Sequence, residues 1–105
     1  MNFRPATRAD FLAFYGRLPP VTVKAVVADD GEKPIGVGGY YLKNGMAVAF
    51  TNQRGMTKRQ VVRAGRVMMR LLAPLGMNVI AGADGEGTAL RHFGFEPYGE
   101  VWRLR

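Results

Sequence analysis

Residues 46–72 constrain the fold most, because they read as a strand, a tight turn and a long amphipathic helix. Thr57 and Gln60 form a T-x-x-Q capping box, in which each side chain bonds a backbone N–H at the start of a helix. Apolar residues then recur at spacings of three and four, which places them on one side of that helix. They are Val61, Ala64, Met68 and Leu71. Because the N-terminus of a helix favours anions, we expect the turn to bind an anion.

Four arginines lie on another side of the same helix. They are Arg59, Arg63, Arg66 and Arg70. The whole chain carries 15 Lys and Arg against 8 Asp and Glu, a net charge of +7. Such an excess favours a polyanionic partner: a nucleic acid, a phosphorylated cofactor or an acidic protein surface. The arginines could follow a phosphate backbone, but no motif for reading bases accompanies them, so a nucleic acid is the least favoured partner.

Length and composition indicate the number of domains and argue against disulfides, metal sites and membrane spans. A chain of 105 residues with 48% hydrophobic residues predicts a single domain, residues 1–105, that folds unaided. Without cysteine and with one histidine, the chain predicts neither disulfides nor a metal site. No run approaches the roughly 18 apolar residues of a membrane span, and no signal peptide is present. We therefore expect a soluble, cytoplasmic protein with no membrane partner.

The rest of the sequence predicts five more strands and two more helices. The expected strands are 2–6, 21–28, 34–42, 46–51, 77–83 and 101–104, and the expected short helices cover about 7–15 and 86–93. Lys43-Asn44-Gly45 predicts a hairpin, because Asn-Gly accepts the positive φ angles of a tight turn. A strand that follows a helical crossover runs parallel to its predecessor. The predicted fold is α/β (α+β), order β-α-β-β-β-α-β-α-β, with antiparallel N-terminal strands and a central parallel pair.

This order, together with two short motifs, resembles the GCN5-related N-acetyltransferase (GNAT) superfamily. Residues 3–10, F-R-P-A-T-R-A-D, resemble its opening I-R-P-A-T-x-x-D, and residues 89–96, A-L-R-H-F-G-F-E, resemble its close A-x-x-x-x-x-G-F-E. Residues 52–57, N-Q-R-G-M-T, stand where the family carries Q/R-x-x-G-x-G/A, and only Gly55 is kept. The chain is most similar to compact GNAT-like proteins of bacteriophages, which would act in the cytoplasm of an infected host cell.

The resemblance implies that acetyl-CoA binds at residues 50–59. Gly55 would permit the phosphate-binding turn, and Thr57, in place of the second glycine, would offer a hydroxyl. The pantetheine arm would enter a gap between residues 47–51 and 79–83. The expected cofactor-binding residues are Phe50, Thr51, Asn52, Gln53, Arg54, Gly55, Met56, Thr57, Lys58 and Arg59.

The resemblance also implies N-acetyl transfer to a primary amine. Many members use as the acid a tyrosine four residues before the Gly-Phe glycine, and that position here is Leu90. Tyr98 and His92 are the nearest replacements, and we take them as the candidate catalytic residues. Asp84 and Glu86 are candidate bases, because they follow a parallel strand at its carboxyl end, although a simple turn explains them equally well.

The missing tyrosine and the reduced glycine motif also suit a GNAT-like domain without turnover. Such a domain would be a binding or assembly module, in a virion or as a regulator of another protein. Its partner would be a second copy of the chain or a different protein. Tyr41, Trp102 and the final strand are candidate interface elements.

Overall fold

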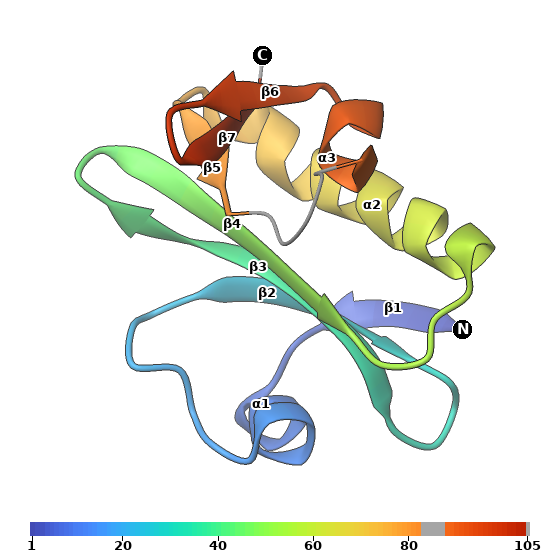
Figure 1. The fold of residues 1–105 in the computed structure, drawn as a ribbon. Coiled ribbons are helices and arrows are strands. Elements are labelled where there is room, and N and C mark those ends of the chain that lie inside the picture. Colours follow the sequence, from blue (N-terminus) through green and yellow to red (C-terminus); the bar gives the residue numbers. More distant parts are fainter. Residues whose placement is uncertain (83–87, 105) are drawn as a thin grey trace.

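A twisted mixed sheet forms the centre of the molecule (Figure 1). The computed structural model describes residues 1–82 and 88–104. In spatial order the described strands are β1-β2-β3-β4-β5-β7-β6, and among their pairings only β4–β5 is parallel. Their bounds are β1 (Asn2–Pro5), β2 (Lys24–Asp29), β3 (Pro34–Lys43), β4 (Met46–Gln53), β5 (Val79–Ala81), β6 (Phe95–Tyr98) and β7 (Val101–Leu104). The prediction of a mixed α+β sheet is confirmed.

The C-terminal end differs from the predicted order, which contained one strand there instead of two. Gly99, with φ +63°, turns the chain between β6 and β7, and the two strands pair antiparallel. We did not predict β6 because it contains Pro97, and within sheets proline is confined to edge strands. β6 is indeed an outer edge strand, while β7 lies between β6 and β5.

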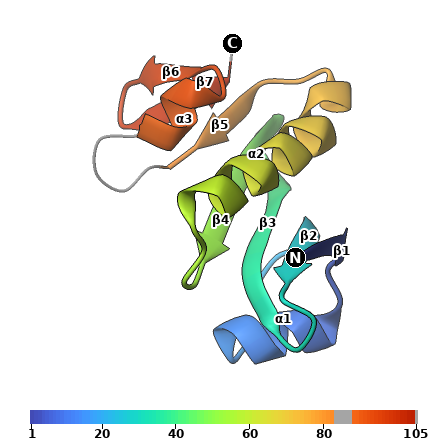
Figure 2. The ribbon, with the colours of Figure 1, turned by 90° about the vertical axis from the view of Figure 1, so that its right-hand side faces the viewer.

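Helices cover both faces of the sheet (Figures 1 and 2). Helix α1 (Arg8–Tyr15) lies on one face, and α2 (Lys58–Leu72) crosses the other, with α3 (Thr88–His92) beside it. A 3₁₀ turn, η1 (Ala73–Leu75), continues α2. None of the helices within residues 1–82 and 88–104 has the length and apolar character to cross a membrane.

Capping boxes begin both longer helices. Thr57 accepts from the backbone N–H of Gln60, and the Gln60 side chain accepts from the N–H of Thr57, as the sequence predicts. Thr7 and Asp10 form the equivalent pair at α1. Since such caps satisfy backbone donors that have no partner inside the helix, they fix where each helix starts.

The sheet separates two apolar clusters. On the α2 face, Met68 and Leu72 pack on Ala47, Ala49 and neighbours in β5 and β6. On the α1 face, Phe11 and Phe14 pack on Val27 and Val37, and Val27 is completely buried. Alternate residues of β3 and β4 therefore face different cores, as side chains of a strand must.

A cluster of charges ties β1 to α1 and β2. Both guanidinium Nη atoms of Arg4 donate to the Asp10 carboxylate, at 2.6 and 2.8 Å, and Arg4 Nε donates to Asp29 at 2.9 Å. Asp10 is 6% exposed and also accepts from the Thr7 N–H. The hydrogen bonds from Arg4 hold the pKa of Asp10 well below its usual range. Residues 4–10 thus have a structural role.

Candidate functional site

The parallel pairing of β4 with β5 stops halfway along β4. The last paired residues are Ala49 and Ala81, whereas β4 continues to Gln53 beside β3 alone. The Ala47 N–H points to the β5 side, where it donates to the Asn78 carbonyl at 2.9 Å. Since backbone groups alternate along a strand, those of Thr51 and Gln53 point to the same side. In the described part of the chain no strand pairs with them there, so this edge of β4 is open.

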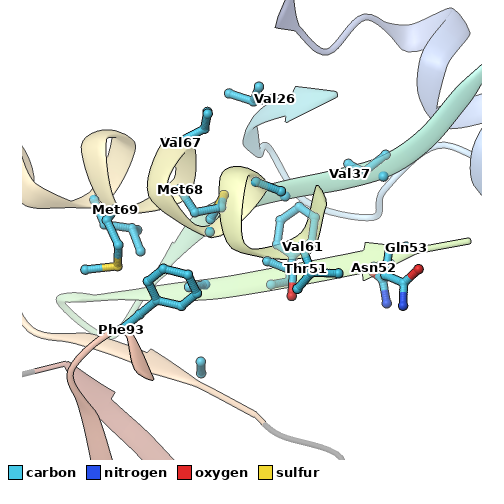
Figure 3. Close-up of a pocket in the computed structure, with 18 of the residues that line it drawn as sticks. Val26, Val37, Thr51, Asn52, Gln53, Val61, Val67, Met68, Met69 and Phe93 are labelled. Atoms are coloured by element: carbon cyan, nitrogen blue, oxygen red, sulfur yellow. The ribbon is translucent and has the colours of Figure 1, made fainter. Parts of the chain in front are cut away.

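A cavity of about 450 Å³ adjoins the open edge, between α2 and the sheet (Figure 3). Two glycines of β3 let methionine side chains of the cavity wall lie close against the sheet. A Cβ on Gly38 would lie 2.7 Å from Met68 Sδ, and one on Gly36 would lie 2.9 Å from Met56 Sδ. Met69 and Phe93 also line the cavity, as Figure 3 shows. Its walls are therefore largely apolar and, because thioether side chains are flexible, adaptable.

The turn after β4 depends on Gly55. Its φ of +69° is a conformation that other L-residues rarely adopt, and a Cβ there would meet nothing within 4 Å. Gly55 is thus needed for its backbone angles and not for a close approach within the chain. The Gln53 side chain reinforces the turn by accepting from the Met56 N–H at 3.0 Å.

Capping determines which donors the helix start can offer. The Thr57 N–H is bonded to Gln60, and the Thr57 hydroxyl already accepts from the Gln60 N–H. Lys58 and Arg59 occupy the first turn, where backbone N–H groups have no partner within the helix. Both residues are exposed, and neither forms an ion pair with a described residue. Their N–H groups and charges are therefore available to an anion.

Arg54 lies on the other side of the turn. Its guanidinium donates to the Phe14 carbonyl and stacks over the Phe14 ring, 4.4 Å from the centroid. Its backbone N–H donates to Ile35 at 2.8 Å. Arg54 thus anchors the turn to α1 and β3.

Asn52 and Phe50 face α1, whereas Thr51 and Gln53 face α2. Phe50 packs against the apolar cluster of α1, and Asn52 Oδ1 accepts from the Tyr15 hydroxyl at 2.7 Å. Burial raises the pKa of Tyr15. Tyr15 could not be predicted at this edge, because its partner Asn52 is 37 positions away and no local pattern joins them.

Neither of the two candidate catalytic residues lines the cavity. His92 ends α3 as an exposed residue, with its ring 4.9 Å from that of Phe93. Tyr98 is 54% exposed at the end of β6, and the Arg103 guanidinium lies 4.5 Å from its ring centroid. Leu90, at the position of the family tyrosine, does line the cavity. Asp84 and Glu86 fall outside the described residues.

The arginines of α2 point to solvent. All four are exposed, and none forms an ion pair with a described residue. Among the four, only Arg63 has an aromatic neighbour within the described part of the chain, the Phe3 ring at 5.8 Å. The helix holds no acidic residue, so its outer face is strongly cationic.

No protein-family model, curated protein or solved structure matches the chain. Across residues 1–82 and 88–104, no cluster of three or more histidine or acidic side chains is suited to hold a metal ion. The site is thus defined by its own geometry: an open strand edge, an apolar cavity and a cationic helix start.

Proposed function

We propose that the protein is an acetyl-CoA-dependent N-acyltransferase of the GNAT type, acting on a primary amine. The observation that carries the proposal is the open edge of β4, which leads directly into the Gly55 turn and the start of α2. A strand edge with free N–H and C=O groups suits the amide-containing pantetheine arm, and a helix N-terminus suits a pyrophosphate. The open strand edge adjoins the helix start along the chain, as the pantetheine arm adjoins the pyrophosphate in CoA.

The described residues fit such a cofactor. Thr51 and Gln53 would hold its amides through their backbone groups, and Lys58 and Arg59 would hold its phosphates. The apolar cavity would exclude water from the thioester end. Acetyl-CoA would supply a carbonyl carbon that bonds to the amine nitrogen as the carbon–sulfur bond breaks, and the proton leaving nitrogen goes to sulfur.

Calorimetry with acetyl-CoA, followed by a free-thiol assay with a panel of amines, tests this function. We expect binding by the full chain and thiol release with at least one amine. Gly55→Glu should abolish binding, because it places a carboxylate where the phosphates would lie. Gly55→Ala is the matched control, since it has the same backbone strain without the charge.

We expect the Glu variant to bind at least tenfold more weakly than the Ala variant. Equal affinities in the two variants would mean that the cofactor lies elsewhere, and the absence of binding at low salt would reject it altogether.

One observation favours a second candidate, a GNAT-like module that binds without turnover. No histidine or carboxylate is among the described residues that line the cavity. A chain that binds acetyl-CoA but releases no thiol with any amine would be such a module, so the same pair of assays separates the two.

A further inference from the structure

The outer side of α2 carries a straight row of cations, which we call the arginine stripe. Its members are Arg59, Arg63, Arg66 and Arg70. Because they are spaced by four, three and four residues, they stay within a narrow arc of the helix. At a rise of about 1.5 Å per residue the stripe is about 16 Å long. All four side chains are exposed, and none forms an ion pair with a described residue, so their charges are available to a partner.

The stripe lies opposite the apolar side of the helix. Met68 and Leu72 are buried against the sheet, which α2 crosses in Figure 2. Val61 and Ala64 line the cavity below the helix. At about 100° per residue, the centre of the stripe is about 180° from these apolar residues. Since the apolar side already packs on the rest of the fold, α2 cannot insert it into a lipid surface as an interfacial helix does.

The chemistry of the stripe favours phosphates as its partner. A guanidinium is a planar fork of N–H donors that matches two oxygens of one phosphate, and every cation of the stripe is an arginine. A nucleic-acid duplex presents about ten phosphate charges over the length of the stripe. A regular row of cations suits such a regular polymer of anions, whereas carboxylates on a folded protein follow no repeat of this kind.

The surroundings of the stripe favour a duplex over a single strand. Proteins that bind single strands stack the bases on aromatic rings, and none of residues 58–72 is aromatic. The Phe3 ring is half-buried and lies 5.8 Å from the Arg63 guanidinium, which covers it. Contacts to phosphates need neither such a platform nor a motif that reads bases.

We propose that the arginine stripe binds the phosphate backbone of a nucleic-acid duplex, independently of base sequence. Arg63, Arg66 and Arg70 lie outside the proposed cofactor site. The duplex site therefore does not rest on acyl transfer, and either proposal can fail without the other.

Fluorescence anisotropy tests the site, with labelled DNA and RNA duplexes of two unrelated sequences titrated with the full chain at several salt concentrations. Each phosphate contact contributes about −0.9 to the slope of log affinity against log salt for DNA, so four contacts predict a slope of about −3.6. The affinity for DNA should then fall about 150-fold between about 50 and 200 mM salt. The two sequences should bind equally well.

Two double variants separate the stripe from the overall charge. Arg63→Gln/Arg66→Gln removes two cations from the middle of the stripe and should halve the slope, to about −1.8. Arg8→Gln/Arg17→Gln is the matched control, because it makes the same change in net charge. Arg8 begins α1 and Arg17 follows it, on the other face of the sheet, and both are exposed. This control should keep a slope of about −3.6.

Several outcomes would overturn the proposal. They are no binding of either duplex, an equal loss of slope in the two double variants, or a strong preference for one base sequence. Equal affinity for a single strand, for poly-glutamate, or for vesicles of phosphatidylserine and phosphatidylcholine would also overturn it, because the partner would then be another class of anion. Binding of only one of the DNA and RNA duplexes would support the stripe and identify its nucleic acid.

Discussion

The ring of Phe93 occupies the place that a side chain at residue 65 would need. Gly65 lies in the middle of α2, and a Cβ there would overlap three atoms of that ring. Glycine inside a helix is unfavourable by about 1 kcal/mol relative to alanine. Because residue 65 has no side chain, Phe93, which follows α3, can pack directly against α2. There its ring forms part of the cavity wall.

Gly65→Ala should destabilise the protein, although alanine is the better helix former. Overpacking costs about 1–3 kcal/mol and exceeds the gain in helix propensity, so we expect a net loss of about 1 kcal/mol in urea unfolding. Adding Phe93→Leu should recover much of that loss by making room for the methyl group. A single variant more stable than the natural chain would show that Phe93 does not rest on Gly65.

Adjacent glycines of β3 should respond differently to the same change. A Cβ on Gly39 would overlap the Lys24 carbonyl oxygen, which is backbone and cannot move alone, whereas one on Gly38 meets the flexible Met68 side chain. We expect Gly39→Ala to lower the free energy of unfolding by about 3 kcal/mol and Gly38→Ala by about 1 kcal/mol or less. Denaturant titration of both variants measures the difference, and similar losses would contradict the packing described for β3.

Lys58→Glu should change stability and cofactor affinity in opposite directions. A negative charge in the first turn of α2 interacts favourably with the helix dipole. The free energy of unfolding should therefore rise by about 0.5 kcal/mol, and the melting temperature with it. The same change removes a cation from the proposed phosphate site, so acetyl-CoA affinity should fall about tenfold. Lys43→Glu provides the control, because it makes an equal change in net charge at the β3–β4 hairpin, the end of β4 opposite to the Gly55 turn. If both variants weakened binding equally, only the overall charge would matter.

The Arg4–Asp10 pair should make stability depend on acidic pH. Arg4 lowers the folded-state pKa of Asp10, so the ionised carboxylate contributes stability above its unfolded pKa of about 4. That contribution is lost progressively as the pH falls below 4 towards the folded pKa. Asp10→Asn should cost about 2 kcal/mol at pH 7, from the loss of charged hydrogen bonds.

Unfolding in urea from pH 6 to pH 2 tests this dependence. The natural chain should lose more stability over that range than the Asp10→Asn variant, and parallel curves would exclude Asp10 as the cause.

Local signals explain what the sequence predicted well. The Thr57–Gln60 box and the Asn44–Gly45 turn each depend on residues close together in the chain, and the structure contains both. The β6 strand was missed because its Pro97 also suits a loop. Strand 21–28 was expected too early, since its β-branched residues begin at Val21 although pairing begins at Lys24.

Contacts between distant elements account for what could not be predicted in the candidate site. Arg54 carries a charge that suits a phosphate, and only the packing of α1 shows that it binds the Phe14 carbonyl instead. Likewise, the roles of Gly36, Gly38 and Gly65 depend on which side chains face them. A pattern of residues shows where a chain can turn, whereas the space left by a missing side chain is a property of the assembled fold.

The open edge of β4 has a consequence for association between molecules. Strand edges with free backbone groups can pair with other chains and cause aggregation, and proline blunts them. Both outer strands of this sheet carry one, Pro5 in β1 and Pro97 in β6. The unpaired half of β4 has none, and its residues 51–53 are exposed. The two outer edges of the sheet are thus blunted by proline, whereas the unpaired end of β4 offers an added strand backbone groups that no proline blocks.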